Sequence, residues 1–296
     1  MDEQLMQALQ ICPPAIRECT MQLAHRANLF VEEIRLRAGK PAAIYANGRE
    51  WKLSQQGDFL LVSQETVAQV ISCAMEYSLY AAQSQLCGGY CTVRGGHRIG
   101  ICGECTCVDN NITAFTHFSS VNIRVAHALP GTADAITDMI WKEPASVLII
   151  GPPGSGKTTV LRDLVRQLSD RLRQTVSLVD ERFELAASFH GTPQFDVGSA
   201  TDVLSGAPKS AAVSLLVRSM RPQWIAVDEI TRSEDLRAIA EASYCGVKFA
   251  ATAHADGFED LSSRPVYRNL MDMKVFRHIV MIGKDRKLSV ERNICA

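Results

Sequence analysis

The sequence has no apolar run of the length that a membrane requires, and its charge is almost balanced. Spanning a bilayer takes about 20 consecutive apolar residues, and no stretch of the chain approaches this. The formal net charge at pH 7 is -1, which argues against a general nucleic-acid coat, because such binding neutralises many phosphates. The start, Met1-Asp2-Glu3, lacks the basic and apolar regions of a signal peptide. We therefore expect a cytoplasmic protein that binds no nucleic acid and reaches a membrane only through a partner.

A second pair of metal-binding cysteines is also missing, although the chain has 10 cysteines. Cys102 and Cys105 have the spacing of half a zinc site, but no matching pair follows. Alternation along a strand would put Cys105 and Cys107 on one face, where buried thiols pack as small apolar groups. Without an export signal we expect reduced cysteines. Packing is the favoured interpretation, and zinc is the alternative.

The most specific signal for chemistry is the glycine-rich stretch Gly151–Thr159. It follows an apolar run, Ser146–Ile150, and precedes apolar residues at helical spacing in Val160–Arg166. In this strand, loop and helix order, G-x-x-x-x-G-K-T binds the phosphates of a nucleoside triphosphate, since backbone N–H groups and the positive helix end face the anion. We expect Lys157 to reach the β- and γ-phosphates and Thr158 to ligate Mg²⁺. The expected phosphate-binding residues are Gly151, Pro152, Pro153, Gly154, Ser155, Gly156, Lys157, Thr158 and Thr159.

Two further strands are predicted to end in paired carboxylates. Trp224–Val227 leads into Asp228 and Glu229. Following a P-loop, the first carboxylate of such a pair holds Mg²⁺ and the next polarises the attacking water. Asp180 and Glu181 end another apolar run, so either carboxylate could share in activating water. A helix cap combined with a surface ion pair is the alternative interpretation of this second pair.

A histidine and several arginines complete the set of candidate catalytic residues. His254 follows a third apolar strand, where it could contact the γ-phosphate and report its loss. A P-loop site that transfers a phosphoryl group also needs a cation that stabilises this group, and an arginine from a neighbouring subunit can supply it. Each arginine considered for this role also fits a solvated strand or helix face. These arginines are Arg94, Arg98, Arg124 and Arg218.

The pattern of apolar runs predicts two domains of different class. Short alternating strands and a few helices over residues 1–128 indicate a small α+β domain. Residues 129–296 alternate buried strands with helices, which predicts an α/β domain with a mostly parallel sheet, and Leu129-Pro130-Gly131 marks the boundary. Strands are expected at 31–37, 41–45, 51–53, 113–118, 121–125, 146–150, 175–180, 224–228 and 247–252, and on both sides of 95–96. Helices are expected on both sides of residues 13–14, after Ser63, and at 133–141, 160–166, 211–220 and 234–244.

The ordered motifs resemble the stage III sporulation AA family, within the type II/type IV secretion and pilus ATPase superfamily. The resemblance covers nearly the whole chain. It rests on the segments Glu33–Gly39, Arg94–Gly100, Gly151–Thr159, Val179–Arg182, Thr201–Leu204, Arg218–Pro222, Ala226–Glu229 and Ala251–His254.

This resemblance implies a RecA-like P-loop domain, ATP and Mg²⁺ as ligands, and a ring, expected to be a hexamer. The ring would hydrolyse ATP to assemble or move components of a membrane complex, with integral membrane proteins of a secretion or sporulation channel as partners. By position, Asp180 and Glu181 match the acidic box, and His254 matches the histidine box. The segment after His254, Ala255–Phe258, is shorter than in the superfamily.

Other functions remain open from the sequence alone. A nucleotide-gated scaffold would bind ATP with little turnover, although Glu181, Glu229 and His254 together favour a motor. A nucleic-acid translocase is disfavoured by the balanced charge. A small-molecule kinase is the weakest alternative, because no arginine-rich lid segment follows the P-loop helix.

Overall fold

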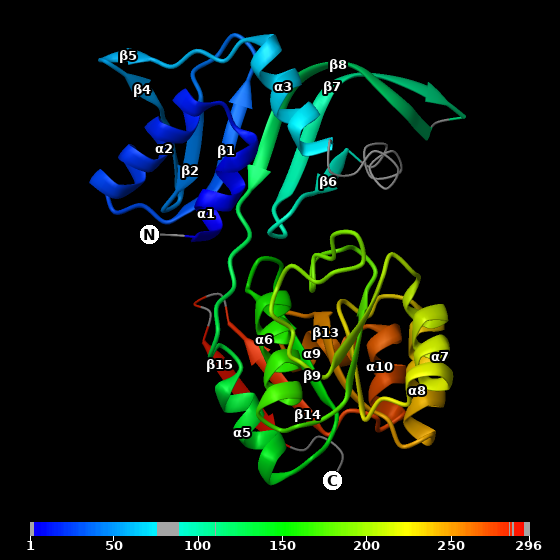
Figure 1. The fold of residues 1–296 in the computed structure, drawn as a ribbon. Helices are drawn as coiled ribbons and strands as arrows, with labels where there is room; N and C mark the ends of the chain where they lie inside the picture. Colours follow the sequence, from blue (N-terminus) through cyan, green and yellow to red (C-terminus); the bar gives the residue numbers. More distant parts are fainter. Residues whose placement is uncertain (1–2, 76–88, 110, 284, 286, 293–296) are drawn as a thin grey trace. The chain divides into compact units, whose positions relative to one another are not determined.

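Two large sheets organise the chain, one in each of two units, Met1–His127 and Ala128–Ala296, and two short strands pair separately in the first unit (Figure 1). The computed structural model describes residues 3–75, 89–109, 111–283, 285 and 287–292. Each unit has an apolar core of its own. We therefore describe the units separately.

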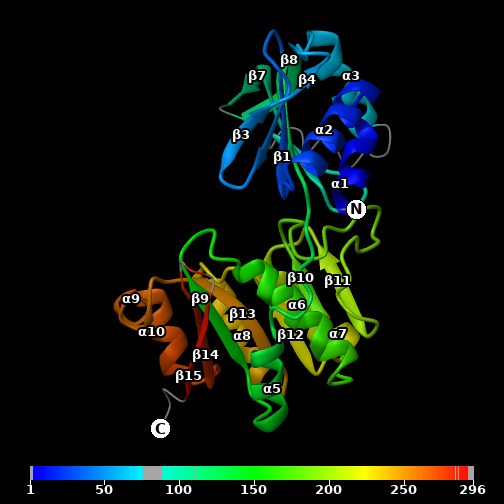
Figure 2. The same ribbon diagram turned by 90° about the vertical axis from the view of Figure 1, so that its left-hand side faces the viewer.

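The first unit contains an antiparallel sheet covered by helices. Its elements are α1 (Glu3–Ala8), η1 (Leu9–Ile11), α2 (Pro14–Arg26), β1 (Val31–Arg37), β2 (Ala43–Ala46), β3 (Arg49–Lys52), β4 (Ser54–Gln55), β5 (Asp58–Phe59), α3 (Gln64–Met75), β6 (Tyr90–Thr92), β7 (Arg98–Val108) and β8 (Asn111–Arg124). The order of the main sheet is β3-β2-β1-β8-β7-β6. Ile34 and Leu36 of β1 are fully buried in the same core as residues of α1, α2 and α3, and these helices lie on one side of the sheet (Figure 2).

Several local predictions for this unit are confirmed. Pro14 begins α2 at a position where a missing N–H is tolerated. Asn47 and Gly48 both have positive φ, 50° and 77°, as a tight turn between β2 and β3 requires. Ser63 caps α3, since its Oγ accepts a hydrogen bond from the Thr66 N–H at 3.1 Å.

Two predictions for this unit are wrong. The strands expected at 113–118 and 121–125 are one strand, β8, because its pairing with β7 continues past residue 119 with only a register shift between Cys102 and Gly103. Cys105 and Cys107 are exposed, not buried, since the far part of β7 and β8 extends past the helices that cover the sheet (Figure 1). In the described part of the chain, no group of three or more potential metal ligands comes together.

The second unit contains a sheet with the order β11-β10-β12-β13-β9-β14-β15. Its strands are β9 (Val147–Gly151), β10 (Val176–Asp180), β11 (Thr201–Ser205), β12 (Trp224–Val227), β13 (Lys248–His254), β14 (His278–Ile282) and β15 (Leu288–Arg292). Its helices are α5 (Asp134–Lys142), α6 (Lys157–Asp170), α7 (Lys209–Met220), α8 (Ser233–Tyr244), α9 (Phe258–Ser263) and α10 (Pro265–Asp272). Every strand pairing is parallel except that of β14 with β15, which confirms the predicted mostly parallel sheet.

The parallel direction of these strands positions the functional residues. β9, β10, β12 and β13 are apolar and buried along nearly their whole length, because helices cover both faces of such a sheet. Helix α6 packs on β9, β10 and β13, whereas α7, α8, α9 and α10 share a separate apolar cluster with the strands. The carboxyl ends of the four strands therefore meet at one edge. Within the described residues, every helix is too short or too polar to cross a bilayer.

Burial divides the thiols into reactive and unreactive groups, and alkylation of the folded protein should show this. Burial raises the pKa of Cys12 to about 12 and that of Cys91 to about 11, so at pH 8 both stay as unreactive thiols. Iodoacetamide should instead label Cys102 and Cys245, which are exposed. Peptide mass spectrometry after a short pulse measures this difference. Labelling of Cys12 in the folded protein as fast as in urea would contradict it.

Candidate functional site

The glycine-rich loop joins β9 to α6 and curls into a cradle. Gly151 ends β9, and a Cβ there would lie 2.7 Å from both the Ile282 carbonyl and Ser155 Oγ, so only glycine fits. Gly156 precedes α6 with φ 101°, a conformation that side chains disfavour. Ser155 Oγ is buried, and it is one of the described polar side-chain atoms that have no hydrogen-bond partner. A buried hydroxyl in this loop fits an anion as its missing partner.

Lys157 is buried at the start of α6, 6% exposed. Its ammonium donates to the carbonyls of Gly151 and Pro152 at 2.8 and 2.9 Å and contacts His254 Nδ1 at 3.0 Å. Burial lowers the pKa of Lys157, and the nearby carboxylates of Asp228 and Glu229 oppose this shift. The lysine is therefore held inside the loop that it would serve in phosphate binding.

Asp228 sits directly after β12 and is fixed by two hydroxyl groups. Thr158 Oγ1 donates to Asp228 Oδ2 at 2.9 Å, and Thr252 Oγ1 donates to Asp228 Oδ1 at 2.5 Å. Carboxylate and hydroxyl oxygens are the hard ligands that Mg²⁺ prefers. The donor set that the structure brings together thus fits a magnesium ion held by Thr158 and Asp228.

Glu229 stands in a left-handed backbone conformation, with φ 53°. Its N–H donates to Thr252 Oγ1 at 2.7 Å. Both oxygens of its carboxylate are engaged: Oε1 lies 2.5 Å from His254 Nε2, and Oε2 accepts from Arg182 at 2.7 Å. Lys157, His254, Glu229 and Arg182 consequently form one continuous chain of polar contacts.

The acidic pair at the end of β10 has structural partners. The buried Asp180 carboxylate accepts four backbone N–H groups, which belong to Glu184, Leu185, Ala186 and Ala187. Glu181 forms an ion pair with Lys209, which is buried at the start of α7. The expectation that Asp180 activates water has no support in its geometry, because its oxygens are committed to the loop. The alternative of a helix cap and a surface ion pair is not met either, because the N–H groups belong to a loop and the ion pair is mostly buried.

Most of the predicted site residues line one pocket of about 530 Å³. The loop, the strand ends and four apolar side chains contribute to it. Its lining residues are Leu129, Thr132, Gly154, Ser155, Gly156, Lys157, Thr158, Thr159, Val160, Glu184, Asp228, Glu229, Thr252, His254, Ile282 and Leu288. A smaller adjoining pocket contains Glu181 and Arg182 and shares Glu184, Asp228 and Glu229 with it.

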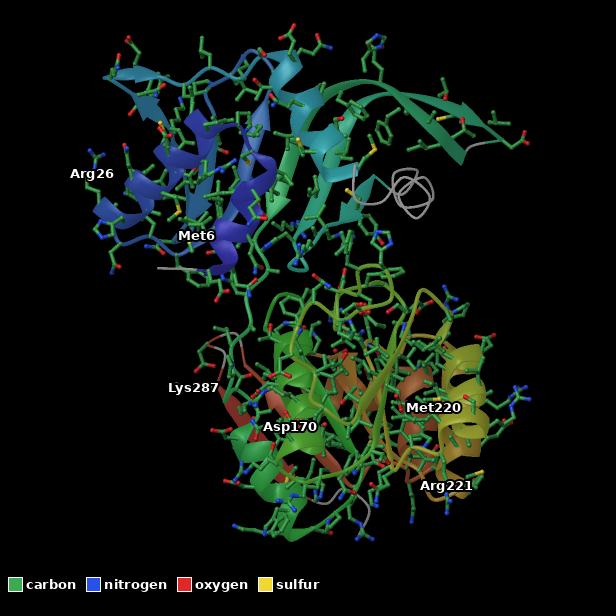
Figure 3. All side chains as sticks on the ribbon, in the orientation of Figure 1. Met6, Arg26, Asp170, Met220, Arg221 and Lys287 are labelled. Atoms are coloured by element: carbon green, nitrogen blue, oxygen red, sulfur yellow. The ribbon has the colours of Figure 1, made fainter. Side chains whose placement is uncertain are left out.

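Arg218 does not join this site in its own chain. It is exposed in the last turn of α7, the end that Figure 3 marks with Met220 and Arg221. Its Nε donates to the Ser214 carbonyl at 3.1 Å, and no residue of α7 is among the described residues that line the larger pocket. A catalytic role for Arg218 from a neighbouring subunit stays a prediction.

Sequence reasoning missed Arg162, Arg182 and Lys209 as parts of this site. Arg162 lies under the loop after β10, where its guanidinium donates to the carbonyls of Leu185 and Glu184 at 2.6 Å each. Burial lowers the pKa of Arg162 to about 10. An arginine one turn after Thr158, amid the apolar residues of α6, was the available signal. The sequence around Lys209 contained no such signal, since its partner, Glu181, follows a different element, β10.

Comparisons with known proteins find a matching family and a protein of similar sequence. The family described as "Sporulation stage III, protein AA" matches residues 2–294. The chain is 33% identical over 280 residues to stage III sporulation protein AA of Bacillus subtilis (strain 168), covering 93% of this chain and 90% of that protein.

Two solved structures share the fold. The pilus retraction motor PilT with bound ADP has a TM-score of 0.62 at 17% identity, over 93% of this chain and 83% of PilT. The Legionella pneumophila ATPase DotB has a TM-score of 0.59 at 17% identity, over 95% of this chain and 81% of DotB. The predicted fold class, α/β with a RecA-like P-loop domain, is confirmed.

We expect Asp180→Asn to destabilise the fold. An amide offers one oxygen where the carboxylate accepts four N–H groups, and its own N–H₂ would face backbone donors. Leaving buried donors unpaired costs about 1–3 kcal/mol, which urea unfolding of the full chain would measure. Asp202→Asn, at an exposed position of β11, is the control. Equal stability of the two variants would contradict the role assigned to Asp180.

Proposed function

Because the chain belongs to the Sporulation stage III, protein AA family, we propose that it is an ATPase of sporulation that works as the secretion and pilus motors do. The observation that carries the proposal is the meeting of Lys157, Asp228, Glu229 and His254 in the pocket under the P-loop. Bound ADP in the PilT structure supports the choice of nucleotide. We also propose that the two units are the predicted domains, 1–128 and 129–296.

The proposed reaction is hydrolysis of ATP to ADP and inorganic phosphate. The oxygen of a water molecule attacks the γ-phosphorus, the bond to the β,γ-bridging oxygen breaks, and its electron pair leaves with ADP. Glu229 accepts the proton of that water, as a carboxylate within hydrogen-bond reach does. Mg²⁺ held by Thr158 and Asp228 would neutralise charge on the phosphate oxygens.

His254 connects phosphate binding to the base. Its Nδ1 faces Lys157, and its Nε2 faces Glu229. If the lysine donates to Nδ1, then Nε2 carries the proton and donates to the carboxylate. A phosphate that draws Lys157 away from Nδ1 would thus change the hydrogen bonding of Glu229. We propose this as the way in which His254 reports the γ-phosphate.

Assembly and location extend the proposal. We propose a homo-hexameric ring that acts on integral membrane proteins of a sporulation or secretion channel, in the cytoplasm and at the membrane through these partners. The family membership supports the link to sporulation. The fold shared with DotB and PilT supports only the architecture of the ATPase unit.

Two substitutions separate binding from turnover. Lys157→Ala should abolish ATP binding, because the ammonium is the cation held inside the loop. Glu229→Gln should keep ATP bound and lower turnover at least about 100-fold, because an amide cannot accept the proton of water. Fluorescent-nucleotide titration and phosphate release measure the two effects.

Matched controls exist for both substitutions. Lys142→Ala, at the exposed end of α5, and Glu234→Gln, in the exposed first turn of α8, should behave as the unaltered protein. Unchanged turnover in both test variants would refute the site. ATP binding with negligible turnover in the presence of the membrane partner would favour the scaffold, and stimulation by DNA would favour the translocase.

The mass of the assembly in solution tests the proposed ring. With a non-hydrolysable ATP analogue, the protein should form a species of six subunits by light scattering, because the proposed ring would assemble on bound nucleotide. Lys157→Ala should not form this species at the same nucleotide concentration. A monomer at every concentration with bound analogue would contradict the hexamer.

A further inference from the structure

Among the described residues, the two adjoining pockets are lined by the cations Lys157, Arg182 and Lys209, besides His254. A fourth cation, Arg162 of α6, holds the loop after β10. Lys157 belongs to the phosphate loop. Arg162 is buried and donates to two carbonyls of the loop after β10. Lys209 is buried against Glu181. Three of the four cations are therefore committed to fixed structural partners or to the phosphate loop.

Arg182 differs from these cations in its exposure and in its partner. Its side chain is 59% exposed, and its guanidinium bonds Glu229 Oε2 at 2.7 Å. It follows β10 at the sheet edge where the phosphate loop and the Asp228–Glu229 pair also lie. Its pocket shares Glu184, Asp228 and Glu229 with the nucleotide pocket. The guanidinium is thus one hydrogen bond away from the group that would activate water.

We propose that Arg182 stabilises the transferred phosphoryl group within its own chain, an inference that rests on the ATPase function proposed above. A general base in hydrolysis lies next to the attacking water, and that water lies next to the γ-phosphorus. A flexible arginine bonded to this base can therefore reach the γ-phosphate oxygens. There it neutralises the charge that develops as the β,γ bond breaks and water adds.

The same movement releases the base. The pair is partly exposed, 59% at Arg182 and 23% at Glu229, and single charges that water reaches attract each other weakly. The γ-phosphate carries more negative charge than one carboxylate. The guanidinium also matches phosphate oxygens with two parallel donors. Bound triphosphate therefore competes with Glu229 for Arg182 and frees Oε2 to accept the proton of water.

This assignment differs from the expectation formed on the sequence. The arginines considered there were Arg94, Arg98 and Arg124 of the first unit and Arg218 of α7, which would act from a neighbouring subunit. Arg182 was noted only as part of a motif. Its contact with Glu229 spans 47 residues of sequence, so only the fold brings the two groups together.

The test compares Arg182→Ala and Arg182→Lys with Arg277→Ala. Arg277 is also 59% exposed and has one carboxylate partner, Glu143, near the opposite ends of the strands. We expect Arg182→Ala to keep its affinity for ADP within about threefold and to lose about 1000-fold in kcat, the effect of such an arginine elsewhere. Arg182→Lys should recover part of this loss, because it keeps charge without the planar fork.

A second readout distinguishes catalysis from a structural role. ADP with aluminium fluoride and Mg²⁺ mimics the transferred phosphoryl group, so the unaltered protein and Arg277→Ala should trap labelled ADP with it. Arg182→Ala should bind ADP but not trap it. Equal trapping, or equal kcat, in Arg182→Ala and the unaltered protein overturns the role of Arg182, and so does a higher kcat.

Mixing two inactive variants tests whether the arginine acts in its own chain. If Arg182 served a neighbour, co-assembled Glu229→Gln and Arg182→Ala subunits would regain turnover, because an intact base would meet an intact arginine. We expect no recovery at any ratio, and recovery overturns the assignment. If the unaltered protein binds no nucleotide, the proposed function itself fails. If it hydrolyses ATP and Arg182→Ala does so equally, only the role of Arg182 fails.

Discussion

The hydroxyl group of Thr252 links two strands at the carboxyl edge of the parallel sheet. It is fully buried, donates to Asp228 Oδ1, and accepts the N–H of Glu229. One side chain on β13 thereby fixes both residues that follow β12. The direction of the Asp228 carboxylate towards Thr158, and that of Glu229 towards His254, depends on this link. The site is in this sense a property of two neighbouring parallel strands.

Helix α6 connects the glycine-rich loop to the loop that follows β10. It begins with Lys157 and carries Arg162 one turn later, and Arg162 holds the carbonyls of residues 184 and 185. Asp180 holds the N–H groups of the same segment. A cation thus binds the carbonyls of the segment and an anion binds its N–H groups, so charged partners hold the segment through both kinds of backbone group. A shift of α6 on binding phosphate would therefore move this segment together with the helix.

The position of a candidate site residue could be predicted from the sequence where that residue ends a strand or comes directly after one. The phosphate loop, Asp228, Glu229 and His254 could be placed because parallel strands bring their carboxyl ends to one edge. Asp180 could be placed there too, but not its role, since that depends on four N–H groups that a later loop presents. The pairing of Lys209 with Glu181, and of Arg182 with Glu229, depends on tertiary contacts between elements. No local pattern encodes such contacts. The burial predicted for Cys105 and Cys107 was wrong, because alternation along a strand shows which residues share a face but not whether another element covers that face.

The backbone of Glu229 sets a limit on stability. A left-handed conformation costs a residue with a side chain about 1–2 kcal/mol, and Glu229 adopts it at φ 53°. Glycine at this position would relieve that strain and remove the carboxylate together with it. Selection for thermostability alone would therefore favour loss of this carboxylate. A library screened only for heat resistance would therefore accumulate glycine at this position.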